Sequence, residues 1–135
     1  MRQLNFETMR LPEDYEAAPD GSEVRPLLRV ERGSLVHCVL PEDRVSRAIR
    51  HNTVEEIWYF LEGEGEVWRK LGDREEIVRV FPGTSISIPR ATSFQFKNTG
   101  RGSLQFLCIT MPPWPGEGEA MRVMDRWEPK VPLEI

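Results

Sequence analysis

The fold is decided by one stretch of the sequence, residues 51–63, which read HNTVEEIWYFLEG. Its second half is a run of apolar and aromatic side chains that ends at a glycine, and a run of this kind is typical of a β-strand. We therefore expect a strand over residues 57–62. Side chains on one face of a strand recur at every second residue, so Trp58 and Phe60 follow Glu56 on the same face. The stretch predicts a strand that carries a carboxylate and two aromatic rings on one side of a sheet.

The rest of the chain repeats this pattern of short β-prone runs separated by glycine and proline. Strand and turn alternate about every 8–12 residues, which is typical of a sandwich or a barrel. No long amphipathic helix interrupts the pattern, so we expect an all-β fold. The expected strands cover residues 27–30, 34–40, 45–51, 57–62, 65–70, 75–80, 85–88, 93–98 and 104–111, and residues 71–74 are expected to turn a hairpin.

The length and the distribution of proline predict the domain organisation. The chain has 135 residues, which suits a single domain. Residues 1–26 contain several prolines and turn residues, and we expect an irregular N-terminal arm there. Residues 27–111 form the expected barrel. Residues 112–135 begin with a Pro-rich segment that cannot be a central strand, so we expect a C-terminal tail that packs on the barrel or on a partner.

Composition and charge exclude several classes of partner. Hydrophobic residues make up 39% and charged residues 30% of the chain, which indicates a folded protein. The net charge is −4 and no cluster of Lys or Arg is present, so we expect no binding to nucleic acid. No apolar run is long enough to cross a bilayer, and residues 1–7 lack the apolar core of a signal peptide. We therefore expect a cytoplasmic protein without a membrane partner.

The two cysteines, Cys38 and Cys108, both lie in apolar runs that are expected to be strands. Buried, reduced thiols are the expected state, and a disulfide between them is left open. The chain contains no pair of cysteines spaced as CxxC, so a structural zinc site built on sulfur has no support.

Two spaced motifs resemble the paired motifs of the cupin family. The first family motif runs Gly, five residues, His-x-His, three or four residues, Glu, six residues, Gly. The second runs Gly, five residues, Pro-x-Gly, two residues, His, three residues, Asn. The positions that match are His51, Glu56 and Gly63 in the first motif, and Gly83, Pro89 and Asn98 in the second. The resemblance implies a jelly-roll or double-stranded β-helix barrel, and it implies dimers, so we expect a homodimer.

Four motif positions depart from the family pattern. Asp43 and Ala91 stand where the motifs have glycine, and Ile49 and Phe94 stand where they have histidine. Metal-binding cupins hold a divalent metal with these two histidines, the second histidine of the first motif and its glutamate. This chain keeps only two of the four ligands, and a catalytic metal site generally needs about three protein ligands. We therefore expect no cofactor, and keep as an alternative a divalent transition metal on His51 and Glu56.

The two histidines each allow more than one interpretation. His51 is expected to project into the barrel as a hydrogen-bonded pair with Glu56, which would orient the imidazole for acid–base chemistry. It could otherwise serve as a metal ligand. His37 shares a strand face with apolar neighbours, so it is expected to be a core histidine. The alternative is that His37 projects into the barrel and replaces a missing ligand.

Several side chains are expected to line an apolar pocket with a few polar groups, the usual composition of a small-molecule site. Phe94 is expected at the same depth as His51, and Gln95 is expected to point the opposite way. The sequence therefore predicts a protein that binds a small molecule. The alternatives are an enzyme of isomerase or oxygenase type that uses His51 and Glu56, and a purely structural module. The candidate ligand-binding residues are His51, Glu56, Trp58, Phe60, Phe94, Phe96, Asn98 and His37.

Overall fold

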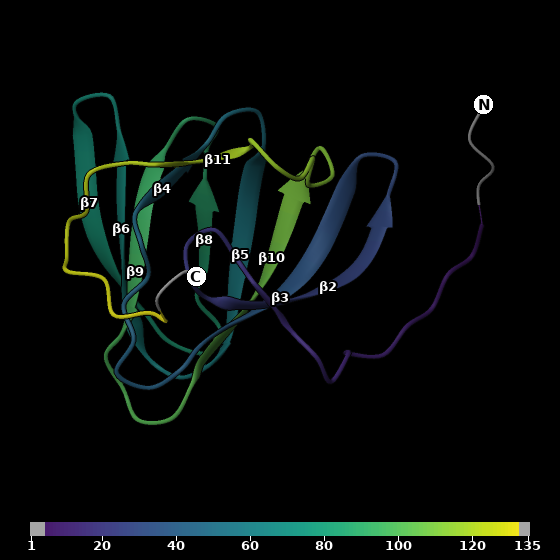
Figure 1. The fold of residues 1–135 in the computed structure, drawn as a ribbon, viewed down its shortest axis with the longest axis horizontal. Helices are drawn as coiled ribbons and strands as arrows, with labels where there is room; N and C mark the ends of the chain where they lie inside the picture. The colour runs from purple at the N-terminus through teal and green to yellow at the C-terminus, as the bar shows by residue number, and fades with distance from the viewer. Residues whose placement is uncertain (1–4, 133–135) are drawn as a thin grey trace.

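The computed structural model describes residues 5–132 and contains only strands (Figure 1). A six-stranded sheet has the order β1-β2-β3-β10-β5-β8, and a five-stranded sheet has the order β11-β4-β9-β6-β7. All pairings between strands are antiparallel. The predicted all-β jelly-roll barrel is confirmed. The strands are β1 Glu16–Ala17, β2 Glu23–Val30, β3 Gly33–Leu40, β4 Ile49–His51, β5 Glu55–Glu62, β6 Gly65–Leu71, β7 Arg74–Val80, β8 Ser85–Ile88, β9 Ser93–Asn98, β10 Leu104–Met111 and β11 Ala120–Arg122.

The predicted strands agree best with the structure in the second half of the barrel, where β8, β9 and β10 have the expected bounds. In the first half, β2 begins at Glu23 and so crosses the expected boundary between arm and barrel at residue 27. The run over residues 45–51 is a strand only at β4. Before β4 the backbone changes partners: Arg47 donates its N–H to the Asp20 carbonyl, and Ala48 donates to the Asp125 carboxylate. These partners come from loops distant in sequence, which the local pattern does not reveal.

The core is built from aromatic rings between the two sheets. Trp58 stacks on Phe106 with ring centroids 4.5 Å apart, and its edges meet Phe94 at 5.2 Å and Phe96 at 5.3 Å. Phe60 also packs on Phe106, at 4.8 Å. Each of these rings is buried. Fully burying one such side chain contributes about 1.5–3 kcal/mol, so the inward face of β5 supplies much of the core.

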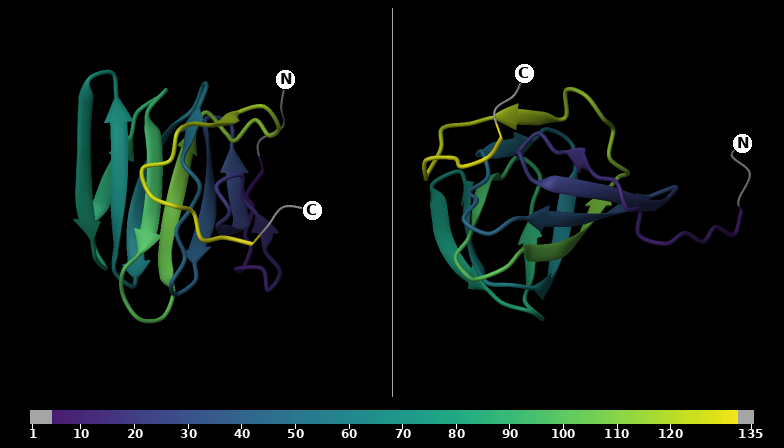
Figure 2. Two further views of the ribbon diagram at one scale, coloured as in Figure 1. Left: turned by 60° about the vertical axis from the view of Figure 1, so that its left-hand side comes forward. Right: turned by 60° about the horizontal axis from the view of Figure 1, so that its bottom comes forward.

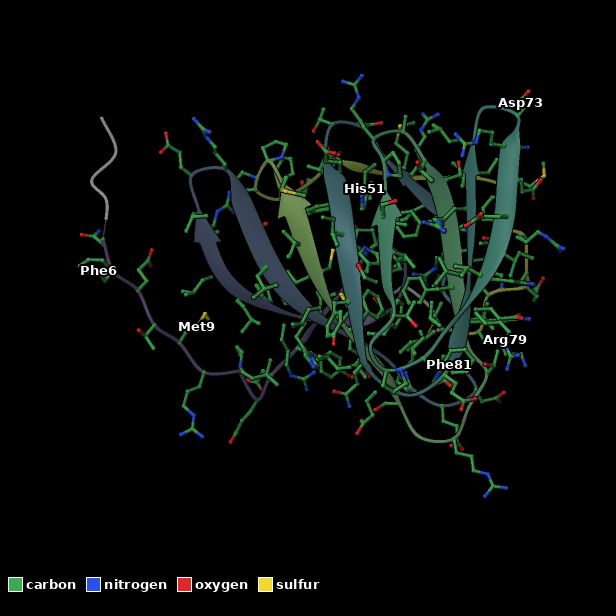
Figure 3. The ribbon with its side chains drawn as sticks, turned by 180° about the vertical axis from the view of Figure 1, so that it is seen from behind. Phe6, Met9, His51, Asp73, Arg79 and Phe81 are labelled. Carbon is green, nitrogen blue, oxygen red and sulfur yellow. The ribbon has the colours of Figure 1, made fainter. Side chains whose placement is uncertain are left out.

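Several motif positions lie in turns whose backbone has a positive φ angle. Gly63 has φ 86°, and a Cβ on it would lie 2.5 Å from the Ser103 carbonyl oxygen, so no other residue fits this position without a shift of the backbone. Asp43 and Ala91 stand where the family motifs have glycine, and they keep positive φ values of 65° and 68°. The chain therefore retains the backbone conformation of those turns without the glycine. The expected hairpin is confirmed, and its turn is the two-residue Gly72-Asp73 (Figure 3).

The C-terminal segment runs across the outside of the barrel (Figure 2). Gln95 points away from Phe94 as expected, but it is fully buried because this segment covers it. Its amide donates to the carbonyls of Ser46 and Trp127, and its oxygen accepts from the backbone N–H of Arg126 and Trp127. Within residues 5–132 there is no helix long and apolar enough to cross a membrane.

A second anchor of the C-terminal segment is the carboxylate of Glu119. It accepts from the backbone N–H of Thr53 at 2.7 Å, from the Thr53 hydroxyl at 2.6 Å and from the backbone N–H of Val54 at 3.0 Å. Burial disfavours the charged form, but these hydrogen bonds outweigh it and hold the pKa of Glu119 below its usual value. The carboxylate thus ties the tail to the loop between β4 and β5.

We predict that Glu119→Ala lowers the free energy of unfolding by about 1–3 kcal/mol, because it removes the acceptor for both backbone N–H groups and leaves the buried N–H of Val54 unpaired. Urea denaturation followed by circular dichroism measures the change. Glu117→Ala, which changes an exposed residue of the same segment, is the matched control and should leave the stability unchanged. Equal stability of the two variants would contradict the anchoring role.

Candidate functional site

A cavity of about 430 Å³ lies at one end of the barrel. Strands β2, β3 and β10 form one wall, β4, β5 and β9 contribute side chains, and residues 16–20 and 114–116 complete the rim. Its walls are mainly apolar and include Val24, Val36, Trp58, Phe94, Phe106 and Trp114. Its polar lining comes from Glu16, Asp20, Arg29, Ser34, His51, Glu56 and Thr110.

Glu56 is held in a fixed orientation inside this cavity. Its Oε1 accepts from the indole N–H of Trp58 at 3.0 Å, and its Oε2 accepts from the Thr110 hydroxyl at 2.8 Å. Both donors follow from strand geometry: Trp58 is the next residue on the same face of β5, and Thr110 is the direct partner of Glu56 on β10. The carboxylate is only 5% exposed, so it is a buried acceptor in a defined position.

His51 projects from β4 into the same cavity, as predicted. Its ring lies edge-on to Phe94, with centroids 5.2 Å apart, and to Trp114, with centroids 5.0 Å apart. The predicted depth of Phe94 is therefore confirmed. The predicted proximity to Glu56 is confirmed, because Nδ1 lies 3.7 Å from Oε1. The two atoms are too far apart for the expected direct hydrogen bond, and an ion pair forms at this distance only with a protonated ring. Nδ1 is buried and has no hydrogen-bond partner.

Asp20 is a site residue that the sequence interpretation missed. It lies in the loop before β2 and lines the cavity, where it is buried. Its Oδ1 accepts from the backbone N–H of Ser22 at 2.8 Å and from the Ser22 hydroxyl at 2.6 Å. Burial raises the pKa of Asp20, the Ser22 bonds and His51 oppose this rise, and Glu56 adds to it. The cavity lining therefore contains two buried carboxylates, and of these only Glu56 occupies a family-motif position.

The thiols of Cys38 and Cys108 also line the cavity, and both are free. Burial, with nearby carboxylates, raises their pKa values well above the usual range for a thiol. The thiols therefore stay neutral, and a neutral thiol is a poor nucleophile and a poor metal ligand. Phe106, Thr110 and Trp114 are further lining residues that the sequence did not single out. No motif marks them, although β10 was predicted.

Four of the candidate ligand residues lie outside the cavity lining. Phe60 and Phe96 pack in the core behind Trp58. Asn98 holds a turn, because its amide donates to the carbonyls of Leu40 and Gly102 and its oxygen accepts from the N–H of Gly100.

His37 is the fourth of these residues. It is buried, as expected of a core histidine, but it does not line the cavity, so the alternative that it replaces a missing ligand is wrong. Its strand neighbour Cys38 faces the core, so His37 lies on the opposite, outer face of the sheet beside Arg25. Burial and the charge of Arg25 lower its pKa, while a hydrogen bond with Gln105 raises it. His37 is therefore buried on the outer face of the sheet, away from the aromatic core.

The metal set of the cupin motifs does not fit this site. Ile49 and Phe94, at the two missing histidine positions, are direct partners across β4 and β9, and both are buried. Their side chains fill the region with carbon where the motif has nitrogen donors. Both oxygens of Glu56 already accept hydrogen bonds from protein donors. Among residues 5–132 there is no group of three or more His, Cys, Asp or Glu side chains that could hold a metal ion.

The fold and the cavity define a small β-barrel protein with an internal pocket. The family model described as "Cupin domain" matches residues 35–110, which is more than half of the chain. A relative from Methanocaldococcus jannaschii, the uncharacterized protein MJ1618, is 35% identical over 103 residues, which cover 73% of this chain and 79% of the relative. The chain therefore belongs to the cupin family.

Solved structures with the same fold are distant in sequence. Oxalate decarboxylase of Bacillus subtilis, described with Mn(II) centres, has a TM-score of 0.71 and 16% identity over 84% of this chain, which spans 31% of that protein. KdgF from Halomonas sp. has a TM-score of 0.63 and 18% identity over 74% of this chain and 88% of its own. The CENP-C domain of Drosophila melanogaster has a TM-score of 0.62 and 17% identity, over 69% of each chain. At these identities the likeness shows the fold alone.

We predict that Asp20 makes the stability of the protein depend on pH. Because its pKa is raised in the folded state, the folded protein holds this proton more tightly than the unfolded chain, so stability falls as pH rises through the raised pKa. Asp20→Asn keeps an acceptor for both Ser22 donors and removes the charge. The stability of this variant relative to the natural chain should therefore increase from pH 4 to pH 7.

Urea denaturation at a series of pH values measures this difference. Asp14→Asn, which changes an exposed aspartate in the N-terminal arm, is the control and should follow the natural chain. Parallel stability curves for Asp20→Asn and the natural chain would show that Asp20 carries no such linkage.

Proposed function

We propose that this protein binds a small, largely apolar organic molecule in the cavity at the end of the barrel. The observation that carries the proposal is the cavity itself. Its volume of about 430 Å³ lies in the range of small-ligand pockets, its walls are mainly apolar, and a few polar groups converge at one end. Such groups fix the orientation of a ligand, while the apolar wall supplies most of the affinity.

The lining also supports this function through its rigidity. Trp58 belongs to the aromatic core and is held by Glu56, and Trp114 packs against His51, so two walls have fixed positions before any ligand arrives. A preorganised pocket loses less entropy when it binds a ligand. Trp114 precedes Gly116 on the rim, in the C-terminal segment, so this segment forms one side of the entrance.

A second candidate function is proton transfer to or from the bound molecule by His51. The observation that favours it is the buried Nδ1 atom without a hydrogen-bond partner, 3.7 Å from a carboxylate oxygen. An imidazole in this position can accept or give a proton once a substrate group reaches it. The proposed proton transfer does not involve a metal like the Mn(II) centres described for oxalate decarboxylase, because Ile49 and Phe94 replace two of the four metal-ligand positions of the family motifs.

The proposed function is tested with a panel of small neutral fragments that each join a ring to one hydroxyl or amide group, screened by ligand-observed NMR. Fragments that bind should compete with one another. Val24→Phe should abolish their binding, since Val24 lies beside Cys38 on the inner face and a larger ring fills the cavity. Trp114→Ala, which removes a wall without adding bulk to the core, should weaken binding by roughly tenfold or more.

Leu61→Phe is the matched control for Val24→Phe. It enlarges an exposed residue of β5 outside the cavity and should leave fragment binding unchanged. Circular dichroism of each variant confirms that it is folded. The proposal fails if neither these neutral fragments nor charged analogues of them bind the natural chain, or if the molecules that bind it bind Val24→Phe and Trp114→Ala equally well.

A further inference from the structure

We infer that the ligand of this cavity is a small organic cation, an amine whose ammonium group faces Asp20 and Glu56 and whose apolar part lies against the aromatic wall. This inference rests on the proposed function and names the chemical class of the ligand. It is carried by the charges that line the cavity, by an unpaired polar atom and by the rings that surround them.

The charges in the cavity are predominantly negative. Asp20 and Glu56 are both buried, and Glu16 lies on the rim. Within residues 5–132 no ion pair joins Lys or Arg to either buried carboxylate, and Glu56 has only His51 within ion-pair distance. Arg29 also lines the cavity, but it is exposed and donates to the Trp114 carbonyl. Burying two carboxylates without a cation beside them is unfavourable, so the site is suited to a ligand that brings a positive charge.

The second observation is His51, which is nearly fully buried and lines the same cavity with an unpaired Nδ1. Buried polar atoms in folded proteins almost always have partners, so an orphaned one indicates a missing hydrogen-bond partner. An ammonium group carries up to three N–H donors. It can therefore donate hydrogen bonds to a neutral imidazole nitrogen and to two carboxylates. A carboxylate ligand, in contrast, would be repelled by the two buried carboxylates.

The third observation is the aromatic wall. Trp58, Phe94, Phe106 and Trp114 all line the cavity. Aromatic faces attract cations, and the attraction is strongest where water is excluded. The same rings pack against the hydrocarbon part of an organic amine. An inorganic cation would not use this wall, which is why the inference specifies an organic one.

A matched series of three probes tests the charge: 2-phenylethylamine is a cation, 2-phenylethanol is neutral and phenylacetate is an anion at neutral pH. Isothermal titration calorimetry on the full chain should show that the amine binds roughly tenfold or more tightly than the alcohol. Phenylacetate should bind most weakly. The series keeps the ring and changes the polar group, so it isolates the effect of charge.

Asp20→Asn and Glu56→Gln should each reduce the preference for the amine over the alcohol toward unity, because each removes one negative charge and keeps an acceptor oxygen. Glu55→Gln is the matched control, since Glu55 is adjacent to Glu56 but exposed, and it should keep the preference of the natural chain. Circular dichroism confirms folding, and either cavity variant alone suffices for the test.

The outcomes separate the inference from the proposed function. If the alcohol or phenylacetate binds as tightly as the amine, the inference is overturned and the pocket function stands. If the amine is preferred equally by Asp20→Asn, Glu56→Gln and the natural chain, it binds elsewhere and the inference is again overturned. If the neutral fragment panel and all three probes fail to bind, both the inference and the proposed function are wrong.

Discussion

Trp58 connects the core of this barrel to its cavity, and the arrangement of the site depends on that connection. Its ring stacks on Phe106 and forms part of the apolar layer between the two sheets, while its indole N–H holds one oxygen of Glu56. Both contacts follow from the alternation of β5, which turns Glu56, Trp58 and Phe60 inward together. A shift of one residue in the register of β5 would expose all three and would remove the core and the polar end of the cavity at once.

The cavity also shows that the cupin fold can hold a site without the metal-binding side chains of the family motifs. At two motif positions, Ile49 and Phe94 replace nitrogen donors with buried carbon, and they face each other across paired strands. The carboxylate of Glu56 remains, and it is bound by protein donors on both oxygens. The other buried carboxylate, Asp20, comes from a loop outside the motifs. Fold membership therefore predicts where the pocket lies, whereas the side chains around it decide what it can bind.

The terminal segments complete the site and are more than connections. The loop before β2 brings Asp20 into the cavity, and the segment after β10 brings Trp114 against His51. Further along, Glu119 and the residues that cover Gln95 fasten the C-terminal segment to the barrel. These anchors are hydrogen bonds to backbone groups that the strand pairing leaves without partners. The C-terminal segment therefore fills these hydrogen-bonding positions and also forms part of the pocket lining.

Local sequence patterns predicted most strands of the barrel, the hairpin turn, the family motifs and the inward position of Glu56, Trp58 and His51. These features depend on local alternation, on turn residues and on fixed spacings, which are all written in short stretches of the chain. Tertiary structure alone decided that Asp20 and Trp114 line the cavity and that His37 lies outside it. Alternation shows which residues share a face, but only the packing of the second sheet decides which face is inside. Contacts between distant segments depend on the path of the whole chain, and no local pattern records that path.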